Sequence, residues 1–99
     1  MNDKFLFEID EAMNIVRLDS DDEFNLPIVE ELNFAIIPYI ESPTGMSATQ
    51  QKQEKLAKTA GRFLLQLWYY GEVSDTDKLI TVIDSLLKTL SLRVNDEIG

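Results

Sequence analysis

Apolar side chains alternate along the first residues of the chain, and this pattern predicts a β-hairpin. Phe5, Phe7 and Ile9 alternate with Leu6 and Glu8, and after the letters DEAM the stretch NIVRLD is again rich in β-branched residues. Alternation with a period of two, interrupted by a short polar segment, is typical of two paired strands. The expected strands cover residues 4–10 and 13–19.

The same residues also fit one amphipathic helix. A helical stripe with spacings of three, four and seven would contain Phe5, Leu6, Ile9, Met13 and Val16. In that helix three other large apolar side chains would face water, namely Phe7, Ile15 and Leu18. Because exposing three such side chains is unfavourable, the hairpin is the preferred interpretation and the helix is the alternative.

A helix is predicted next, from about Asn25 to Tyr39. Asn25 is a suitable N-cap, and Pro27 lies in the first turn, where its missing N–H costs nothing. Pro38 should end or kink this helix, and residues 41–46, ESPTGM, are predicted to form a loop. The stripe expected to face the core consists of Ile28, Leu32, Ala35 and Tyr39, with Val29 and Ile36 beside it.

Two further helices are predicted in the second half of the chain. Ser47 and Gln50 have the spacing of a capping box, which begins a helix that continues to about Tyr70. Gly71 is suited to the position after the last turn. The final helix covers about residues 75–92, and because the connection is short the two helices should pack antiparallel. Its apolar seam contains Leu79, Ile83, Leu86 and Leu90.

Together these elements predict a helix-dominated α+β fold in a single domain, residues 1–99. An N-terminal β-hairpin would be followed by three helices, with the C-terminal antiparallel helix hairpin as the framework. An all-α domain of four helices is the alternative, because the helical interpretation of the first residues stays open. A chain of 99 residues suits one compact domain, but its core is thin, which favours self-association.

The segment Phe63–Tyr70, FLLQLWYY, is apolar or aromatic at every position except Gln66. A helix spreads these side chains around its whole circumference, so that one neighbouring helix cannot cover them all. The segment is either the centre of the domain or partly an interface with a second copy or a partner. Because Trp and Tyr are enriched at interfaces, Trp68, Tyr69 and Tyr70 are candidate partner-binding residues.

Charge is concentrated at one end of the chain. The net charge is −9, and residues 1–41 contain eleven acidic residues against Lys4 and Arg17, while residues 42–99 contain seven of each sign. Phosphate groups bind to cations, so direct binding to nucleic acid or to an anionic membrane is not expected. A basic protein partner is expected instead. The run that would steer it towards the chain consists of Asp19, Asp21, Asp22 and Glu23.

The absence of Cys and His removes most of the chemistry of small enzymes. Without them there is no disulfide, no thiolate nucleophile, no Cys/His zinc site and no imidazole general base. The acidic run has some oxygen ligands in the order of a calcium loop, but Phe24 occupies the position where that turn needs Gly. We therefore expect no enzyme activity, no metal site and no cofactor.

The location and the function follow from the same patterns. No apolar run approaches the roughly 18–20 residues that span a bilayer, and the start, MNDKFLFEID, lacks the features of a signal peptide. A cytoplasmic protein without membrane contact is expected. Its expected function is that of a non-catalytic protein-interaction module or adaptor that self-associates through its C-terminal helices. The alternative is an acidic inhibitor that imitates nucleic acid and occupies the groove of a nucleic-acid-binding protein.

Overall fold

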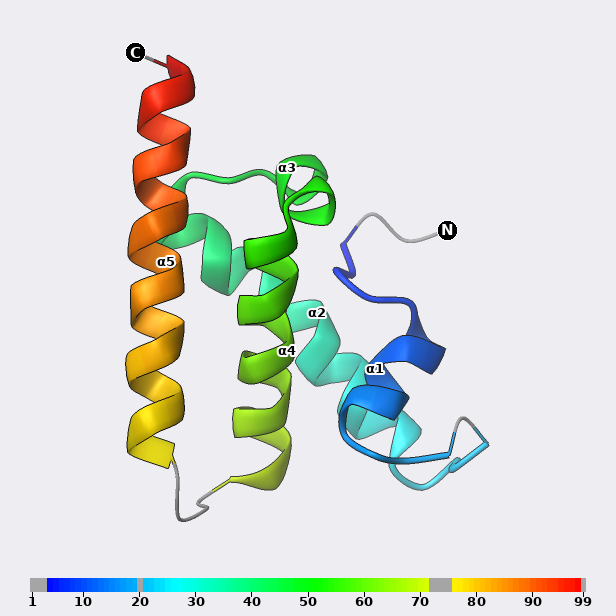
Figure 1. Cartoon of the computed structure of the whole chain (residues 1–99). Helices are drawn as coiled ribbons and strands as arrows, with labels where there is room; N and C mark the ends of the chain where they lie inside the picture. The colour runs from blue at the N-terminus through cyan, green and yellow to red at the C-terminus, as the bar shows by residue number, and fades with distance from the viewer. Residues whose placement is uncertain (1–3, 20, 72–75, 99) are drawn as a thin grey trace.

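The fold is entirely helical in the part of the chain that the structure, a computed structural model, describes: residues 4–19, 21–71 and 76–98 (Figure 1). The helices of this part are α1 (Ile9–Ile15), α2 (Leu26–Thr44), α3 (Ala48–Gln53), α4 (Lys55–Tyr70) and α5 (Thr76–Ile98). These described residues contain no strand, so the predicted α+β fold is wrong and the all-α alternative fits better. The described residues contain one helix more than that alternative, because the helix predicted from Ser47 to Tyr70 is divided into α3 and α4.

The β-hairpin predicted over residues 4–10 and 13–19 is replaced by α1 and an irregular segment before it. α1 begins only at Ile9, after Glu8, whose backbone is extended (φ −62°, ψ 152°). In the irregular segment the neighbouring side chains of Leu6 and Phe7 are both buried. A helix that begins after Phe7 does not leave that side chain in water, and this removes the argument that favoured the hairpin.

α1 ends in a left-handed turn at Arg17 (φ 61°). The amide of Leu18 donates to the carbonyl of Met13 at 2.9 Å, and the amide of Arg17 donates to the carbonyl of Asn14 at 3.0 Å. These two bonds form a Schellman motif, in which Gly usually occupies the left-handed position. The chain then enters the acidic run as a turn, without any β pairing.

α2 continues through both of its interior prolines, Pro38 and Pro43, and ends at Thr44. Gly45 (φ 77°) terminates the helix, and its amide donates to the carbonyl of Glu41 at 2.8 Å. The loop predicted over residues 41–46 is therefore wrong, because the non-helical connection is confined to residues 45–47. A proline removes one amide donor from a helix, but here the backbone is helical on both sides of each proline.

The buried face of α2 differs from the predicted stripe. Ile28 and Tyr39, which were expected in the core, are 45% and 49% exposed. Val29 and Ile36, expected beside the stripe, are buried as predicted, and they share the buried face of α2 with Asn33, Ile37, Ile40 and Thr44. Asn33 lies in the middle of this face, and its polar side chain is the reason why apolar spacing points to the wrong stripe.

The helix predicted from Ser47 to Tyr70 is divided at Glu54. Its capping box is confirmed, since the side chains of Ser47 and Gln50 each accept a hydrogen bond from the main-chain amide of the other residue. Glu54 has an extended backbone (ψ 119°) and separates α3 from α4. Its carboxylate accepts hydrogen bonds from the amide of Leu56 at 3.4 Å and from Arg93 of α5 at 2.6 Å.

Gln51 explains how the short helix α3 is held against α2. The side chain of Gln51 is fully buried, and its Nε2 donates to the carbonyl of Ile37 at 3.0 Å and to the carbonyl of Met46 at 3.1 Å. Buried polar groups are stable only when they find such partners. The chain therefore folds back over α2 before it begins α4.

Two layers of helices make up the molecule. α4 and α5 lie side by side and antiparallel, and α2 crosses behind α4 in Figure 1. α1 packs on α2 and α4 and does not contact α5. The principal-axis extents are 46, 36 and 18 Å, and the shortest corresponds to two helices packed about 10 Å apart. Such a thin body has a large surface for its size, so that the outer faces of α2 and α5 stay uncovered.

The core fills the space between the two layers. Its fully buried large apolar side chains come from α1, α2, α4 and α5, and include Met13, Val29, Ile36, Ile40, Leu64, Leu65 and Leu90. In the seam predicted for α5, Ile83 and Leu90 are buried, whereas Leu79 and Leu86 are only half-buried. The seam is therefore correct in part, and the helix extends beyond its predicted end, to Ile98.

Candidate protein-binding surface

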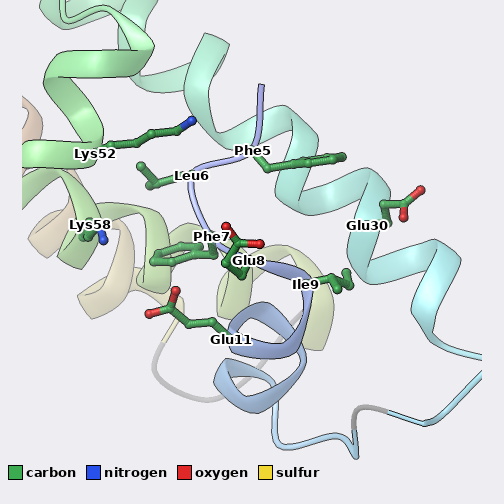
Figure 2. Close-up of a pocket in the computed structure, with 9 residues that line it drawn as sticks. All are labelled: Phe5, Leu6, Phe7, Glu8, Ile9, Glu11, Glu30, Lys52 and Lys58. Atoms are coloured by element: carbon green, nitrogen blue, oxygen red, sulfur yellow. The ribbon is translucent and has the colours of Figure 1, made fainter. Parts of the chain in front are cut away.

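A hollow of about 520 Å³ opens beside the irregular N-terminal segment (Figure 2). Leu6 and Phe7 of its lining are buried and apolar. Charges of both signs surround the opening, from α1 and its N-cap, from α2, from α3 and from α4: Glu8, Glu11, Glu30, Lys52 and Lys58. An apolar floor inside a charged rim suits an amphipathic ligand.

Two smaller hollows continue along the outer face of α2, and Phe34 lines both of them. One measures about 260 Å³ and is lined by Phe5, Pro27, Glu30, Glu31 and Phe34. The other measures about 340 Å³ and is lined by Lys4, Phe34, Ile37, Pro38, Glu41 and Ala48. We call the residues of these two hollows the Phe34 surface. Phe5 and Glu30 also line the hollow of Figure 2, so the three openings adjoin one another.

The ring of Phe34 is 47% exposed, yet other side chains hold it in place. It packs edge-on against Phe5, with ring centroids 5.8 Å apart and an interplanar angle of 74°. The Nζ atom of Lys4 lies 6.0 Å from the centroid of the same ring. Aromatic pairs and cation–π contacts of this kind restrict an exposed ring. A ring that is already positioned loses little entropy when it binds, which favours its use as an anchor.

The rim of the Phe34 surface is acidic. The side chains of Glu30, Glu31 and Glu41 are all exposed, and among the described residues Lys4 is the only cationic one that lines these two hollows. Interfaces commonly combine an apolar centre with a polar rim. A carboxylate rim of this kind is complementary in charge to basic groups.

Two contacts fix the N-terminal segment in the position that completes this surface. Nδ2 of the buried Asn33 donates to the carbonyl of Phe7 at 2.8 Å. Gly61 of α4 lies against the same segment, where a Cβ atom would meet the side chains of Leu6, Phe7 and Ile36. The segment can therefore approach α2 and α4 closely although it has no regular secondary structure.

The acidic run that was predicted to steer a partner is exposed, except at Asp22. Asp19, Asp21 and Glu23 face water, and Asp22 is half-buried. The Asp22 carboxylate accepts hydrogen bonds from the main-chain amide of Asn25 at 3.1 Å and from its side-chain Nδ2 at 2.9 Å. The bonds from Asn25, that of its side chain above all, hold the pKa of Asp22 below its ordinary value. Asp22 thus has a structural role at the start of α2.

The apolar segment Phe63–Tyr70 is used mainly inside the molecule. Leu64 and Leu65 are buried, and the half-buried ring of Trp68 packs edge-on against Tyr39 of α2, with centroids 5.3 Å apart. The side chain of Gln66 donates to the carbonyl of Ile15 at 3.2 Å, and the hydroxyl of Tyr70 donates to the carbonyl of Val16 at 2.9 Å. These contacts agree with the central position that the sequence allows for the segment.

The aromatic and the acidic candidates do not form one site. Tyr69 is half-buried and packs edge-on against Tyr70, whose hydroxyl contacts the chain three residues before Asp19. Trp68, in contrast, contacts α2. None of these candidates lines the Phe34 surface. A role of Trp68, Tyr69 and Tyr70 in binding a partner stays a prediction.

Sequence reasoning missed the residues that form the Phe34 surface. The signal that could have found them is Phe34 itself, a large apolar residue on a helical face with Glu30, Glu31 and Glu41. Its spacing places it outside both the predicted and the observed buried stripes. An aromatic residue among carboxylates on the polar side of a helix indicates either a contact with another part of the chain or a binding surface.

Neither a helix that could span a membrane nor a group of side chains that could hold a metal ion is present among the described residues. None of the helices is long and apolar enough to cross a membrane in the part of the chain searched, residues 4–19, 21–71 and 76–98. Within the same residues no group of three or more acidic side chains is placed to hold a metal ion.

Comparisons with family models, with curated proteins and with solved structures found no match to this chain.

Proposed function

We propose that this chain is a non-catalytic protein-interaction module that binds a basic protein partner through its acidic N-terminal half. The observation that carries the proposal is the ring of Phe34, which is exposed, held by Phe5 and Lys4, and placed between two hollows with a carboxylate rim. Binding energy in protein interfaces is concentrated in such anchored aromatic side chains. The charges of the rim contribute more to the choice of partner and to the association rate than to affinity.

The acidic run supports the same proposal. Asp19, Asp21 and Glu23 are exposed, and between them and α2 lies Phe24, which is 82% exposed. A large apolar side chain inside a group of carboxylates suits a partner that has both basic and apolar groups. In this proposal the run attracts the partner from a distance, and the Phe34 surface provides the close contact.

The test is affinity capture from a lysate of the cells that produce the chain, with wild type and two variants compared. Phe34→Ser removes the anchor, while Leu92→Ser removes an exposed apolar side chain on α5, 64% exposed, and is the matched control. We expect the proteins captured by wild type to be lost with Phe34→Ser and kept with Leu92→Ser. If Phe34→Ser captures the same proteins as wild type, the Phe34 surface is not the binding site and the proposal fails.

We also propose that the module self-associates through its C-terminal helices. Support comes from the first half of α5, where two large apolar side chains are exposed: Ile80 and Val82. Self-association would cover them, as the thin core of a small domain favours. Light scattering at micromolar concentration tests this, with Val82→Glu as the variant. A wild type that is monomeric over the whole range contradicts it.

A second candidate function is that of an acidic inhibitor that imitates nucleic acid. The observation in its favour is that the described carboxylates of residues 4–41 all reach solvent, with only Asp22 half-buried. α1 and α2 also hold several of them on rigid elements, among them Glu11 and Glu30. Such an inhibitor must compete with nucleic acid for one groove.

Two measurements on the captured complex distinguish the candidates. Duplex DNA should release the partner of a nucleic-acid mimic and leave the partner of an adaptor bound. In addition, the triple variant Asp19→Asn, Asp21→Asn, Glu23→Gln should remove most of the binding of a mimic. An adaptor anchored by apolar contacts should lose about tenfold in affinity, about 1.4 kcal/mol, mainly through a slower association rate.

A further inference from the structure

We propose that the Phe34 surface binds a basic amphipathic helix of a protein partner, with one apolar side chain in each of its two hollows. This inference rests on the proposed function and adds the kind of segment that is bound. The size of the hollows, their spacing along α2 and the hydrogen-bond acceptors around them support it.

The size of the hollows favours side chains of a peptide over a small molecule. One hollow, about 260 Å³, is smaller than the roughly 300–1,000 Å³ of sites that enclose a small organic ligand, and the other, about 340 Å³, is at the lower end of that range. The ring of Phe34 lies between the two hollows and lines both. A ligand that fills both hollows must therefore cross over this ring and place one apolar group on each side of it.

The spacing of the hollows matches the repeat of a helix. Glu30 and Glu31 line one hollow, and Ile37 and Pro38, seven positions further along α2, line the other. Seven residues of helix correspond to about 10 Å. A partner helix that lies along α2 also presents side chains seven positions apart on one face, as helices bound in grooves commonly do. Its two apolar anchors are therefore expected at positions i and i+7.

The acceptors around the hollows favour Lys and Arg beside those anchors. Glu30, Glu31 and Glu41 are exposed. Pro38 has no N–H group, so the carbonyl of Phe34 lacks the amide that would bond to it four positions further along the helix. An ammonium or guanidinium group of the partner donates to these oxygens, and charge-assisted bonds of this kind are stronger than neutral ones.

A second copy of this chain is a poorer occupant. Its basic residues on one side of α3 and α4 are Lys52, Lys55, Lys58 and Arg62. They do not share one continuous helix, because the extended backbone of Glu54 separates α3 from α4. Lys52 and Lys58 are also half-buried and line the hollow of Figure 2. Among the described residues, the basic stripe of α3 and α4 is therefore not one uninterrupted helix with apolar anchors between its charges.

The probe for the test is a fluorescently labelled helical peptide of Ala and Lys, with two Leu seven positions apart and both ends blocked. Its binding to the full chain is measured by fluorescence anisotropy. We expect Phe34→Ala to weaken binding at least tenfold, and Leu→Ala in the peptide to do the same. The double variant Glu30→Gln, Glu41→Gln should weaken binding and reduce its dependence on salt.

Two variants of α5 provide matched controls. Asp84→Asn removes one exposed carboxylate, and Leu92→Ala removes one exposed apolar side chain, both from α5. Neither should change the affinity of the peptide. A peptide of the same composition, with its two Leu five positions apart and hence on different faces, should bind at least tenfold more weakly. Circular dichroism of each variant verifies that the helices are formed. The single variant Glu41→Gln tests the charge of the Phe34 surface without a change in its apolar contacts.

Three outcomes would overturn this inference. The first is unchanged binding by Phe34→Ala, the second is equal weakening by the α5 variants, and the third is equal binding of the peptide with the altered spacing. A dimer of the chain that Phe34→Ala dissociates, seen by light scattering, would replace the partner helix with a second copy. If lysate proteins are lost with Phe34→Ser while the peptide does not bind, the proposed function stands and the basic helix is the wrong occupant.

Discussion

Gly61 of α4 leaves the space that the side chain of Leu6 occupies. A Cβ atom on Gly61 would overlap Cδ2 of Leu6, and would lie 3.2 Å from Ile36 and 3.3 Å from Phe7. The absence of a side chain at this one position therefore lets an irregular segment pack directly on a helix. Phe5, which supports the ring of Phe34, belongs to that segment, so Gly61 acts on the Phe34 surface from the inside.

Gly61→Ala should destabilise the protein. Overpacking costs about 1–3 kcal/mol, and replacing Gly by Ala inside a helix returns about 1 kcal/mol, so we expect a net loss in the free energy of unfolding. Denaturant melts measure it. Combining the change with Leu6→Ala is the control, because without the Leu6 side chain Gly61→Ala should become neutral or stabilising. Equal losses in both backgrounds would show that Leu6 is not the side chain displaced.

Leu90→Ala should cost about 2–5 kcal/mol of unfolding free energy, because Leu90 is fully buried between the layers. Leu92→Ala, two positions further along α5 and mostly exposed, should change stability by less than about 0.5 kcal/mol. The half-buried Leu86 is expected between these values. Chemical denaturation measures the free energy of unfolding of the three variants. If Leu92→Ala lost as much as Leu90→Ala, the face of α5 assigned to the core would be wrong.

Tyr70→Phe should destabilise the contact between α4 and α1. The change removes the hydroxyl that donates to the carbonyl of Val16, and the loss of one hydrogen bond typically costs about 0.5–1.5 kcal/mol. Tyr39→Phe is the matched control, because the edge-on contact of Tyr39 with Trp68 does not use the hydroxyl. Thermal melts that are equally shifted by both changes would argue against the bond to Val16.

Asn25→Ala should raise the pKa of Asp22 towards its ordinary value, because the side chain of Asn25 is the main cause of the lowered pKa. A carboxyl group whose pKa is lowered by folding contributes stability above its unfolded pKa and loses it as the pH falls through the folded pKa. The contribution of Asp22 is therefore lost only below its ordinary value of 3.8. NMR titration of its side chain measures this, and Asn14→Ala, at an exposed position of α1, should leave the titration unchanged.

Arg17→Gly should stabilise the protein by up to about 1 kcal/mol. Arg17 has a left-handed backbone (φ 61°), which costs an ordinary residue about 1–2 kcal/mol, while Gly adopts it freely but loses more entropy on folding. Arg17→Ala controls for the removal of charge and keeps the backbone cost. Denaturant midpoints that rise equally for both variants would assign the gain to charge instead of to the turn.

Much of the helical framework could be predicted from the sequence, because its signals are local. The capping box at Ser47 and the glycine after α4 depend on neighbouring residues only. The buried face of α2 could not be predicted in the same way. Asn33 is buried because a carbonyl 26 positions earlier accepts its hydrogen bond, and a contact over that distance leaves no trace in the spacing of apolar residues.

The first residues illustrate the same limit. Leu6 and Phe7 are adjacent and both buried, which a strand with one buried face does not allow, because successive side chains of a strand point to opposite faces. The irregular segment accommodates both by lying between α2 and α4. The Phe34 surface depends on this segment through Phe5, so its existence follows from tertiary packing and not from a motif in the sequence.

The hydrogen bonds from Gln66 to Ile15 and from Tyr70 to Val16 connect residues that lie 51 and 54 positions apart. Closing a loop of that length costs entropy before the contacts compensate for it. We therefore expect α2, α4 and α5 to assemble first during folding, and α1 to dock late. In native-state hydrogen exchange the amides of α1 should open at lower free energy than those of α4. The Phe34 surface, which takes Phe5 from the segment before α1, would then be completed only in the last step of folding.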